Sequence, residues 1–113
     1  MTITLNSTGL TMEQVVEVAR GGAKIEISKE ALEKMAATRA HIETLAKAET
    51  PVYGISTGFG ALAHQHIAPE DRVQLQKSLI RSHAAGMGDA VEKEVVRALM
   101  LLRLNLWLVQ EPG

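Results

Sequence analysis

The sequence predicts a mainly α-helical fold with a small N-terminal β-hairpin. Apolar residues recur at helical spacing along most of the 113 residues. Only 3% of the residues are aromatic, so a core would consist of aliphatic side chains. Two short stretches near the N-terminus alternate polar and apolar residues, as strands do. The length suits one small domain, and the absence of cysteine excludes disulfides.

Composition also excludes several functional classes. The net charge of −1, with both signs mixed along the chain, gives no case for binding nucleic acid or an anionic membrane. Residues 95–109 are strongly apolar but carry two arginines, and they fall short of the roughly 20 residues that cross a bilayer. Residues 1–5 lack the features of a signal peptide. We therefore expect a cytoplasmic protein.

The N-terminal elements are two strands and a short helix. Residues 2–5 and 24–27 are the strands, and we expect them to pair because neither is long enough to stand alone. Between them, Thr11 and Gln14 fit a capping box that begins the helix, and two glycines end it. The buried side of this helix is predicted to consist of Val15, Val16, Val18 and Ala19.

A long helix is predicted next, from Ser28 as its cap to about Ala48. Thr50 ends it, because a residue that precedes proline avoids helical geometry. Its apolar stripe consists of Leu32, Met35, Ala36, Ile42 and Leu45.

Two further helices follow. Pro69 opens the first, which ends at the glycines of residues 85–88. Its buried face is predicted to be Val73, Leu75, Leu79 and Ile80. Asp89, with Glu92 three residues on, begins the last helix. Its stripe is predicted to be Val95, Val96, Leu99, Leu102 and Leu106. This helix is apolar over so much of its circumference that it requires more protein around it.

Between the long helix and Pro69 lies a glycine-rich loop, Tyr53-Gly54-Ile55-Ser56-Thr57-Gly58-Phe59-Gly60. Its glycines permit positive φ and a close approach of backbone to a ligand. A phosphate-binding loop is one interpretation, but the spacing fits neither a P-loop nor a dinucleotide motif. An ordinary tight surface loop is the alternative.

Tyr53 and His83 are the candidate acid–base groups. A phenol has a pKa of about 10, so Tyr53 acts as a base near neutrality only if its anion is stabilised. Its alternative role is a packed ring with a hydrogen-bonded hydroxyl. His83 lies at a predicted helix C-terminus, where it binds a ligand, transfers protons or merely caps the helix.

Metal and hydrolase chemistry are not predicted. His64 and His66 lack a third ligand at a useful spacing, so we expect no metal site. Ser82 adjoins His83, but neighbours on a helix do not face each other, and no nucleophile elbow is present.

Two long motifs carry a resemblance to a known family. The stretch from Tyr53 through Gly60 to Ala63 resembles the tyrosine-loop signature of the aromatic amino acid ammonia-lyases. Residues 75–88, Leu-Gln-Lys-Ser-Leu-Ile-Arg-Ser-His-Ala-Ala-Gly-Met-Gly, resemble their next signature in the form found in histidine ammonia-lyases. The resemblance continues to about Asn105. It implies the N-terminal part of an all-helical lyase fold.

The resemblance also implies a reaction. These enzymes eliminate ammonia from an amino acid with no bound organic cofactor, using a methylidene-imidazolone that forms autocatalytically from an internal Ala-Ser-Gly. A base removes a β-proton, so that L-histidine gives trans-urocanate. The family forms homotetramers.

Site residues follow from the matching positions. Tyr53 corresponds to the base, and His83 with Ser82 to the residues that hold a histidine side chain. A phenylalanine or tyrosine ammonia-lyase is the alternative. The mobile lid loop corresponds to Gly54, Ser56, Thr57, Gly58, Phe59 and Gly60. Ser56 departs from the asparagine that many members carry.

The last residues, 106–113, diverge from the family, and the chain contains no Ala-Ser-Gly. We therefore expect residues 1–113 to be a single incomplete N-terminal lyase domain from a truncated or frameshifted gene. We expect this chain to be inactive alone, and its assembly into the homotetramer of the family is doubtful. The alternative is a non-catalytic helical module that associates with an intact lyase.

Overall fold

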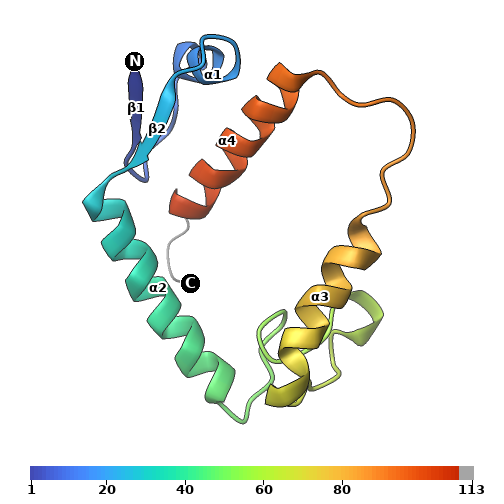
Figure 1. The fold of residues 1–113 in the computed structure, drawn as a ribbon. Coiled ribbons are helices and arrows are strands. Elements are labelled where there is room, and N and C mark those ends of the chain that lie inside the picture. Colours follow the sequence, from blue (N-terminus) through green and yellow to red (C-terminus); the bar gives the residue numbers. More distant parts are fainter. Residues whose placement is uncertain (110–113) are drawn as a thin grey trace. The chain divides into compact units, whose positions relative to one another are not determined.

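The computed structural model describes residues 1–109, which form two compact units. One unit contains residues 1–39 and those from 89 onwards, and the other contains residues 40–88. The predicted mainly helical fold is confirmed. Along the chain, Figure 1 shows β1 (Thr2–Leu5), α1 (Met12–Ala19), β2 (Lys24–Ile27), α2 (Lys29–Lys47), α3 (Arg72–His83) and α4 (Lys93–Val109). None of these helices is long and apolar enough to cross a membrane.

The two strands pair, but the predicted hairpin is wrong. β1 and β2 run parallel, with Ile3 opposite Ile25 and Leu5 opposite Ile27. Parallel neighbours cannot be joined by a tight turn, and α1 provides the crossover connection between them. The helix between the strands was the sequence feature that should have excluded a hairpin.

α1 begins as the sequence predicts. The side chain of Thr11 accepts a hydrogen bond from the backbone of Gln14 (3.2 Å), and the Gln14 side chain accepts one from the backbone of Thr11 (2.9 Å). Its predicted buried side is only partly correct, because Val18 is buried whereas Val16 is exposed. A helix of two turns buries a narrow face, and here that face packs against α4 (Figure 1).

The core of the first unit lies between the strands, α1 and α4. Its buried residues are Ile3, Leu5, Val18, Ala23, Ala31, Leu101 and Leu108. Arg97 fixes the contact between the two helices, since its Nε and Nη2 both donate to the carbonyl oxygen of Val18, at 3.0 and 2.7 Å. These bonds satisfy a carbonyl at the C-terminal end of α1.

α4 departs from prediction in its start and in its buried face. The helix begins at Lys93 rather than Asp89, and Glu92 supplies the first carbonyl, which accepts from the N–H of Val96. Leu101 and Leu108 face the core, whereas the predicted stripe (Val95, Val96, Leu99, Leu102 and Leu106) is exposed. α1 covers only one side of a helix that is apolar on several. Residues 106–109 form its last turn, and the rest of the predicted divergent tail lies outside the described residues.

The second unit contains the end of α2, the glycine-rich loop and α3. Pro69 opens a 3-10 turn (Pro69–Asp71) that leads into α3, close to the predicted helix start. On α3, Leu75 and Leu79 are half-buried, whereas Val73 and Ile80 are exposed, contrary to prediction. Similarly, Ile42 and Leu45 of α2 are half-buried but the rest of its predicted stripe (Leu32, Met35 and Ala36) is exposed.

Candidate functional site

Two buried hydroxyl groups hold the backbone of the residues before and after Tyr53. Ser56 is 0% exposed, and its Oγ accepts a hydrogen bond from the backbone N–H of Val52 over 2.9 Å. Thr57 is 2% exposed, and its Oγ1 accepts from the N–H of Gly54 over 3.3 Å. The same hydroxyl donates to the carbonyl of Gly58 over 3.0 Å. The backbone that carries Tyr53 is therefore fixed by side chains of the loop itself.

The Tyr53 ring is presented outward from this backbone. The residue is 62% exposed, and its ring meets that of Phe59 edge to face, with centroids 5.8 Å apart and planes at 80°. Gly54, at a φ of +71°, permits the contact, because a β-carbon there would lie 3.3 Å from the Phe59 ring. Within residues 1–109 the Tyr53 hydroxyl forms no hydrogen bond, so the ring is packed but the phenol is accessible.

The loop is closed at its base by a short antiparallel pairing. Thr57 bridges to His66, the N–H of Gly58 donates to Gln65, and the N–H of Ile67 donates to the carbonyl of Ser56 over 2.9 Å. Gly58 has no room for a side chain, since a β-carbon would lie 2.7 Å from Leu62 Cβ. The loop is thus tightly bonded here, and its predicted movement as a lid stays a prediction.

Ser82 and His83 converge on one carbonyl group. Ser82 Oγ donates to the carbonyl oxygen of Leu79 over 2.9 Å, and His83 Nδ1 lies 2.9 Å from the same oxygen and 3.0 Å from Ser82 Oγ. The expectation that these neighbours do not meet is wrong, because both side chains reach back one turn of α3. Because a carbonyl oxygen only accepts, a neutral His83 ring that bonds to Leu79 does so as the Nδ1–H tautomer, in which Nε2 is an acceptor, and the residue is exposed.

The structure does not bring Tyr53 into contact with Ser82 or His83. Among the described residues, no hydrogen bond or ring contact joins Tyr53 to Ser82 or His83, although all three belong to the same unit. Nor does any group of three or more His, Asp or Glu side chains within residues 1–109 have a placement that would hold a metal ion.

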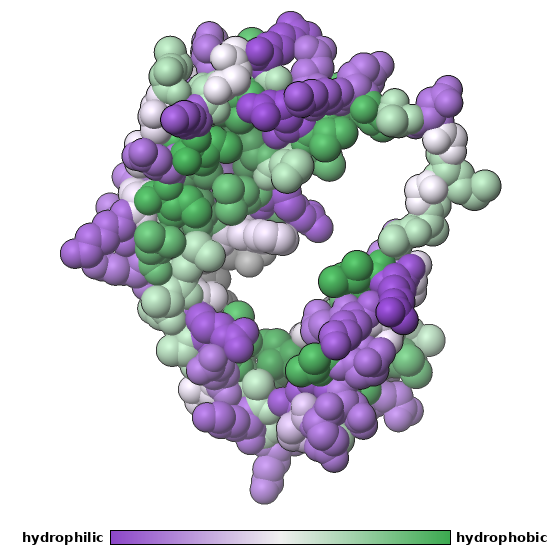
Figure 2. Space-filling model, viewed as in Figure 1, coloured by the Kyte–Doolittle hydropathy of each residue, from purple (hydrophilic) through white to green (hydrophobic). Residues whose placement is uncertain are grey.

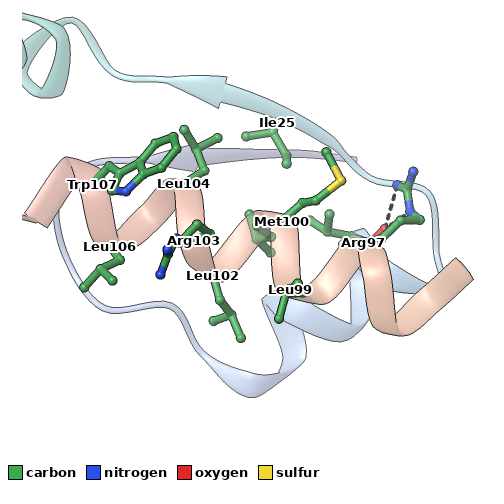
Figure 3. Close-up of a pocket in the computed structure, with 11 residues that line it drawn as sticks. Ile25, Arg97, Leu99, Met100, Leu102, Arg103, Leu104, Leu106 and Trp107 are labelled. Atoms are coloured by element: carbon green, nitrogen blue, oxygen red, sulfur yellow. Dashed lines mark hydrogen bonds between the residues drawn. The ribbon is translucent and has the colours of Figure 1, made fainter. Parts of the chain in front are cut away.

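A separate apolar groove lies in the first unit, along α4. It has a volume of about 860 Å³, and leucines, Met100 and Trp107 of α4 supply most of its lining. In Figure 3, Met100 and Leu104 point towards Ile25 of β2, whereas Leu99 and Leu102 point to another side of the helix. Figure 2 shows hydrophobic residues gathered over β2 and α4. The sequence indicated that the last helix requires more protein around it, but it did not predict this groove.

Comparisons with known proteins agree on one family. A model of the family described as aromatic amino acid lyase matches residues 10–110. A histidine ammonia-lyase from Streptomyces avermitilis is 57% identical over 104 residues, which are 92% of this chain and 20% of that protein. One from Streptococcus gordonii is 46% identical over 103 residues, or 91% of this chain and 20% of that one.

Solved structures of the family share the fold. An ergothionase from Treponema denticola superposes with a TM-score of 0.92 at 30% identity, over 96% of this chain and 22% of that one. A histidine ammonia-lyase from Trypanosoma cruzi gives 0.82 at 36% identity, over 96% and 21%. The chain spans about a fifth of the length of the curated relatives that it matches. Motifs, fold and comparisons together establish that this chain belongs to the aromatic amino acid lyase family.

Proposed function

We propose that this chain forms part of an ammonia-lyase that converts L-histidine to trans-urocanate and ammonia. The relatives named histidine ammonia-lyase, at 44–57% identity, support this reaction over the phenylalanine or tyrosine alternatives. The Ser82-His83 pair supports it independently, as the resemblance to the histidine form of the signature implies.

Tyr53 is the proposed base that removes the β-proton of the substrate. The observation that carries this role is the accessible phenol on a backbone held from both sides by Ser56 and Thr57. Such a base is fixed before substrate arrives, which lowers the entropy lost on reaching the reactive geometry. A phenol with a pKa of about 10 needs a stabilised anion to accept a proton near neutrality. The described residues offer the Tyr53 hydroxyl no donor. The proposed role of Tyr53 thus includes a donor from outside the described residues.

His83 is proposed to hold the imidazole of the substrate, with Ser82 fixing the His83 ring. Because Nδ1 is engaged with the Leu79 carbonyl and Ser82, Nε2 accepts a hydrogen bond from the N–H of a bound imidazole. A phenylalanine side chain has no N–H to donate, so this arrangement favours histidine.

The electrophile of the family does not come from these residues. The resemblance implies a methylidene-imidazolone formed from Ala-Ser-Gly, which makes the substrate nitrogen a better leaving group, and the 113 residues contain no such tripeptide. The roles of Tyr53, Ser82 and His83 therefore concern proton removal and binding alone. We also propose that the 113-residue chain forms no urocanate by itself. The homotetramer and the cytoplasmic location stay predictions.

A chimera tests the proposed function. The segment of the Streptomyces avermitilis histidine ammonia-lyase that this chain matches over 104 residues is replaced by the matching residues of this chain. Purified chimera and L-histidine should produce urocanate, measured by ultraviolet absorbance. A folded chimera that releases ammonia from phenylalanine or tyrosine but not from histidine would reject the histidine assignment.

A second candidate function is a non-catalytic module that associates with an intact lyase. The exposed apolar side of α4 favours it, because Leu99, Leu102 and Leu106 are each at least half exposed and adjoin the groove. Apolar patches of this kind usually mark an interaction surface. The tagged chain should then co-purify with an intact lyase of the family, and Leu102→Glu should abolish the association. Retention of binding by Leu102→Glu would exclude this surface.

A further inference from the structure

We propose that Arg72 is a positioning residue for Tyr53, because its guanidinium holds both ends of the segment that carries the tyrosine. The inference deepens the role proposed above for Tyr53 and rests on it. Neither the motifs of the sequence nor the family resemblance singled out Arg72. The residue lies at the first position of α3 and is half-buried.

The first contact of Arg72 holds the entry to the segment. Its Nη1 donates to the carbonyl oxygen of Ala46 over 2.6 Å. Ala46 lies in the last turn of α2, where carbonyl groups have no partner within the helix and where the helix dipole favours a positive charge. The guanidinium therefore satisfies a group at the point where the chain leaves α2.

The second contact holds the exit. Arg72 Nε donates to the carbonyl oxygen of Ile67 over 3.1 Å, while the N–H of Ile67 donates to the carbonyl of Ser56 over 2.9 Å. Ser56 Oγ in turn accepts from the N–H of Val52, the residue before Tyr53. A series of hydrogen bonds thus links the guanidinium, through Ile67 and Ser56, to Val52, the residue before the proposed base.

The chemistry of arginine suits this role. Its planar guanidinium presents donors in fixed directions and can reach two carbonyl groups at once, whereas a lysine ammonium is a point charge on a flexible stem. Within residues 1–109 Arg72 forms no ion pair, so these carbonyl dipoles are the groups that meet its charge. Arg72 also lines a pocket of the second unit together with Lys47, Glu49 and His66.

The experiment uses the single tyrosine of the chain as its probe. The 113-residue protein is labelled with 3-fluorotyrosine, which gives one ¹⁹F resonance, from position 53. Arg72→Met removes the hydrogen bonds to Ala46 and Ile67, and Arg72→Lys keeps the positive charge but lacks the planar guanidinium. Arg81→Met is the matched control, because Arg81 lies on the same helix and forms no hydrogen bond or ion pair within the described residues. Amide hydrogen exchange is measured on the same samples.

The proposal predicts that Arg72→Met shifts and broadens the ¹⁹F resonance and speeds exchange at the Val52 and Ile67 amides by about tenfold or more. Arg72→Lys should move the resonance in the same direction, and Arg81→Met should leave it unchanged. An unchanged resonance in Arg72→Met would overturn the proposal. So would a loss of protection throughout α3 and residues 40–47, since Arg72 would then stabilise the whole unit rather than position the loop.

This readout does not depend on catalysis. If the chimera forms no urocanate but the resonance responds to Arg72→Met, the proposed function fails while the effect of Arg72 on the Tyr53 segment stands. If the chimera is active and the resonance does not respond, only the inference about Arg72 fails.

Discussion

The backbone N–H of Val52 donates a hydrogen bond to Ser56 Oγ over 2.9 Å, and Ser56 is fully buried. This bond is local in sequence, yet it decides how the chain turns immediately before Tyr53. The resemblance to the lyases treats Ser56 as a minor departure, a small polar residue where asparagine is common. In the structure, the Ser56 hydroxyl holds the backbone beside Tyr53, the proposed base.

Ser56→Ala should therefore destabilise the second unit. The substitution leaves the N–H of the half-buried Val52 without its acceptor, which costs about 1–3 kcal/mol in the free energy of unfolding. Urea denaturation measures this loss. Ser78→Ala is the matched control, because Ser78 is exposed and its change should stay within about 0.5 kcal/mol. Equal losses in the two variants would show that the buried hydroxyl has no special role.

Gly58→Ala should be costly as well, for a steric reason. The new β-carbon would lie 2.7 Å from Leu62 Cβ and 2.9 Å from the Leu62 carbonyl oxygen, so the loop backbone must shift. Overpacking of this kind costs about 1–3 kcal/mol in the free energy of unfolding. Gly86→Ala serves as the control, because nothing lies within 4 Å of its β-carbon position. If both variants unfold at the same urea concentration, the tight contact at Gly58 is not present in solution.

The sequence predicted local features well and packing poorly. The capping box at Thr11 and the ends of α2 depend on neighbouring residues alone, and both were predicted. Strand direction depends on what lies between the strands, and the burial of a helix depends on which partners it has. The apolar periodicity of α4 could not distinguish Leu101, which is buried, from Leu102, which is exposed.

The same limit applies to the candidate site. Tyr53, Ser82 and His83 could be selected because their motifs are contiguous. Arg72 could not, because its two partners, Ala46 and Ile67, are ordinary residues whose carbonyl groups carry no sequence signal. Only the folded structure shows that one guanidinium donates hydrogen bonds to both carbonyl groups.

Leu101 and Leu102 provide a direct comparison of the two sides of α4. Leu101 is 2% exposed and Leu102 is 51% exposed. Leu101→Ala should lower the free energy of unfolding by about 2–5 kcal/mol, through lost burial and the cavity that remains. Leu102→Ala should change it by less than about 0.5 kcal/mol, as surface substitutions usually do. Thermal denaturation of both variants measures the difference. A loss at Leu102 as large as that at Leu101 would mean that this side of α4 is covered.

The ion pair between Arg20 and Glu94 predicts a dependence of stability on pH. The hydrogen bond from Arg20 (2.7 Å), together with its positive charge, lowers the pKa of Glu94 below its ordinary value. A lowered pKa in the folded state stabilises the protein above the unfolded pKa of about 4.3, and the contribution disappears as pH falls through the folded value. Because both side chains are largely exposed, the effect should be small and weakened by salt.

Melting temperatures of the wild type and Glu94→Gln measure this effect. The wild type should melt higher near pH 7, and the two curves should converge on acidification below about pH 4. Glu92→Gln is the control, because Glu92 forms no ion pair within residues 1–109, and it should follow the wild type throughout. A gap between wild type and Glu94→Gln that stays constant from neutral to acid pH would contradict the lowered pKa.

The proposed removal of the β-proton of L-histidine by Tyr53 is tested most directly by the rate at which the chimera forms urocanate. Tyr53→Phe keeps the ring and its edge-to-face contact with Phe59 but lacks the hydroxyl. General acid–base catalysis contributes about 10²–10⁴-fold, so kcat should fall by that factor while circular dichroism and the melting temperature stay unchanged. A Tyr53→Phe chimera that forms urocanate at the rate of the unsubstituted chimera would contradict the assignment of Tyr53 as the base.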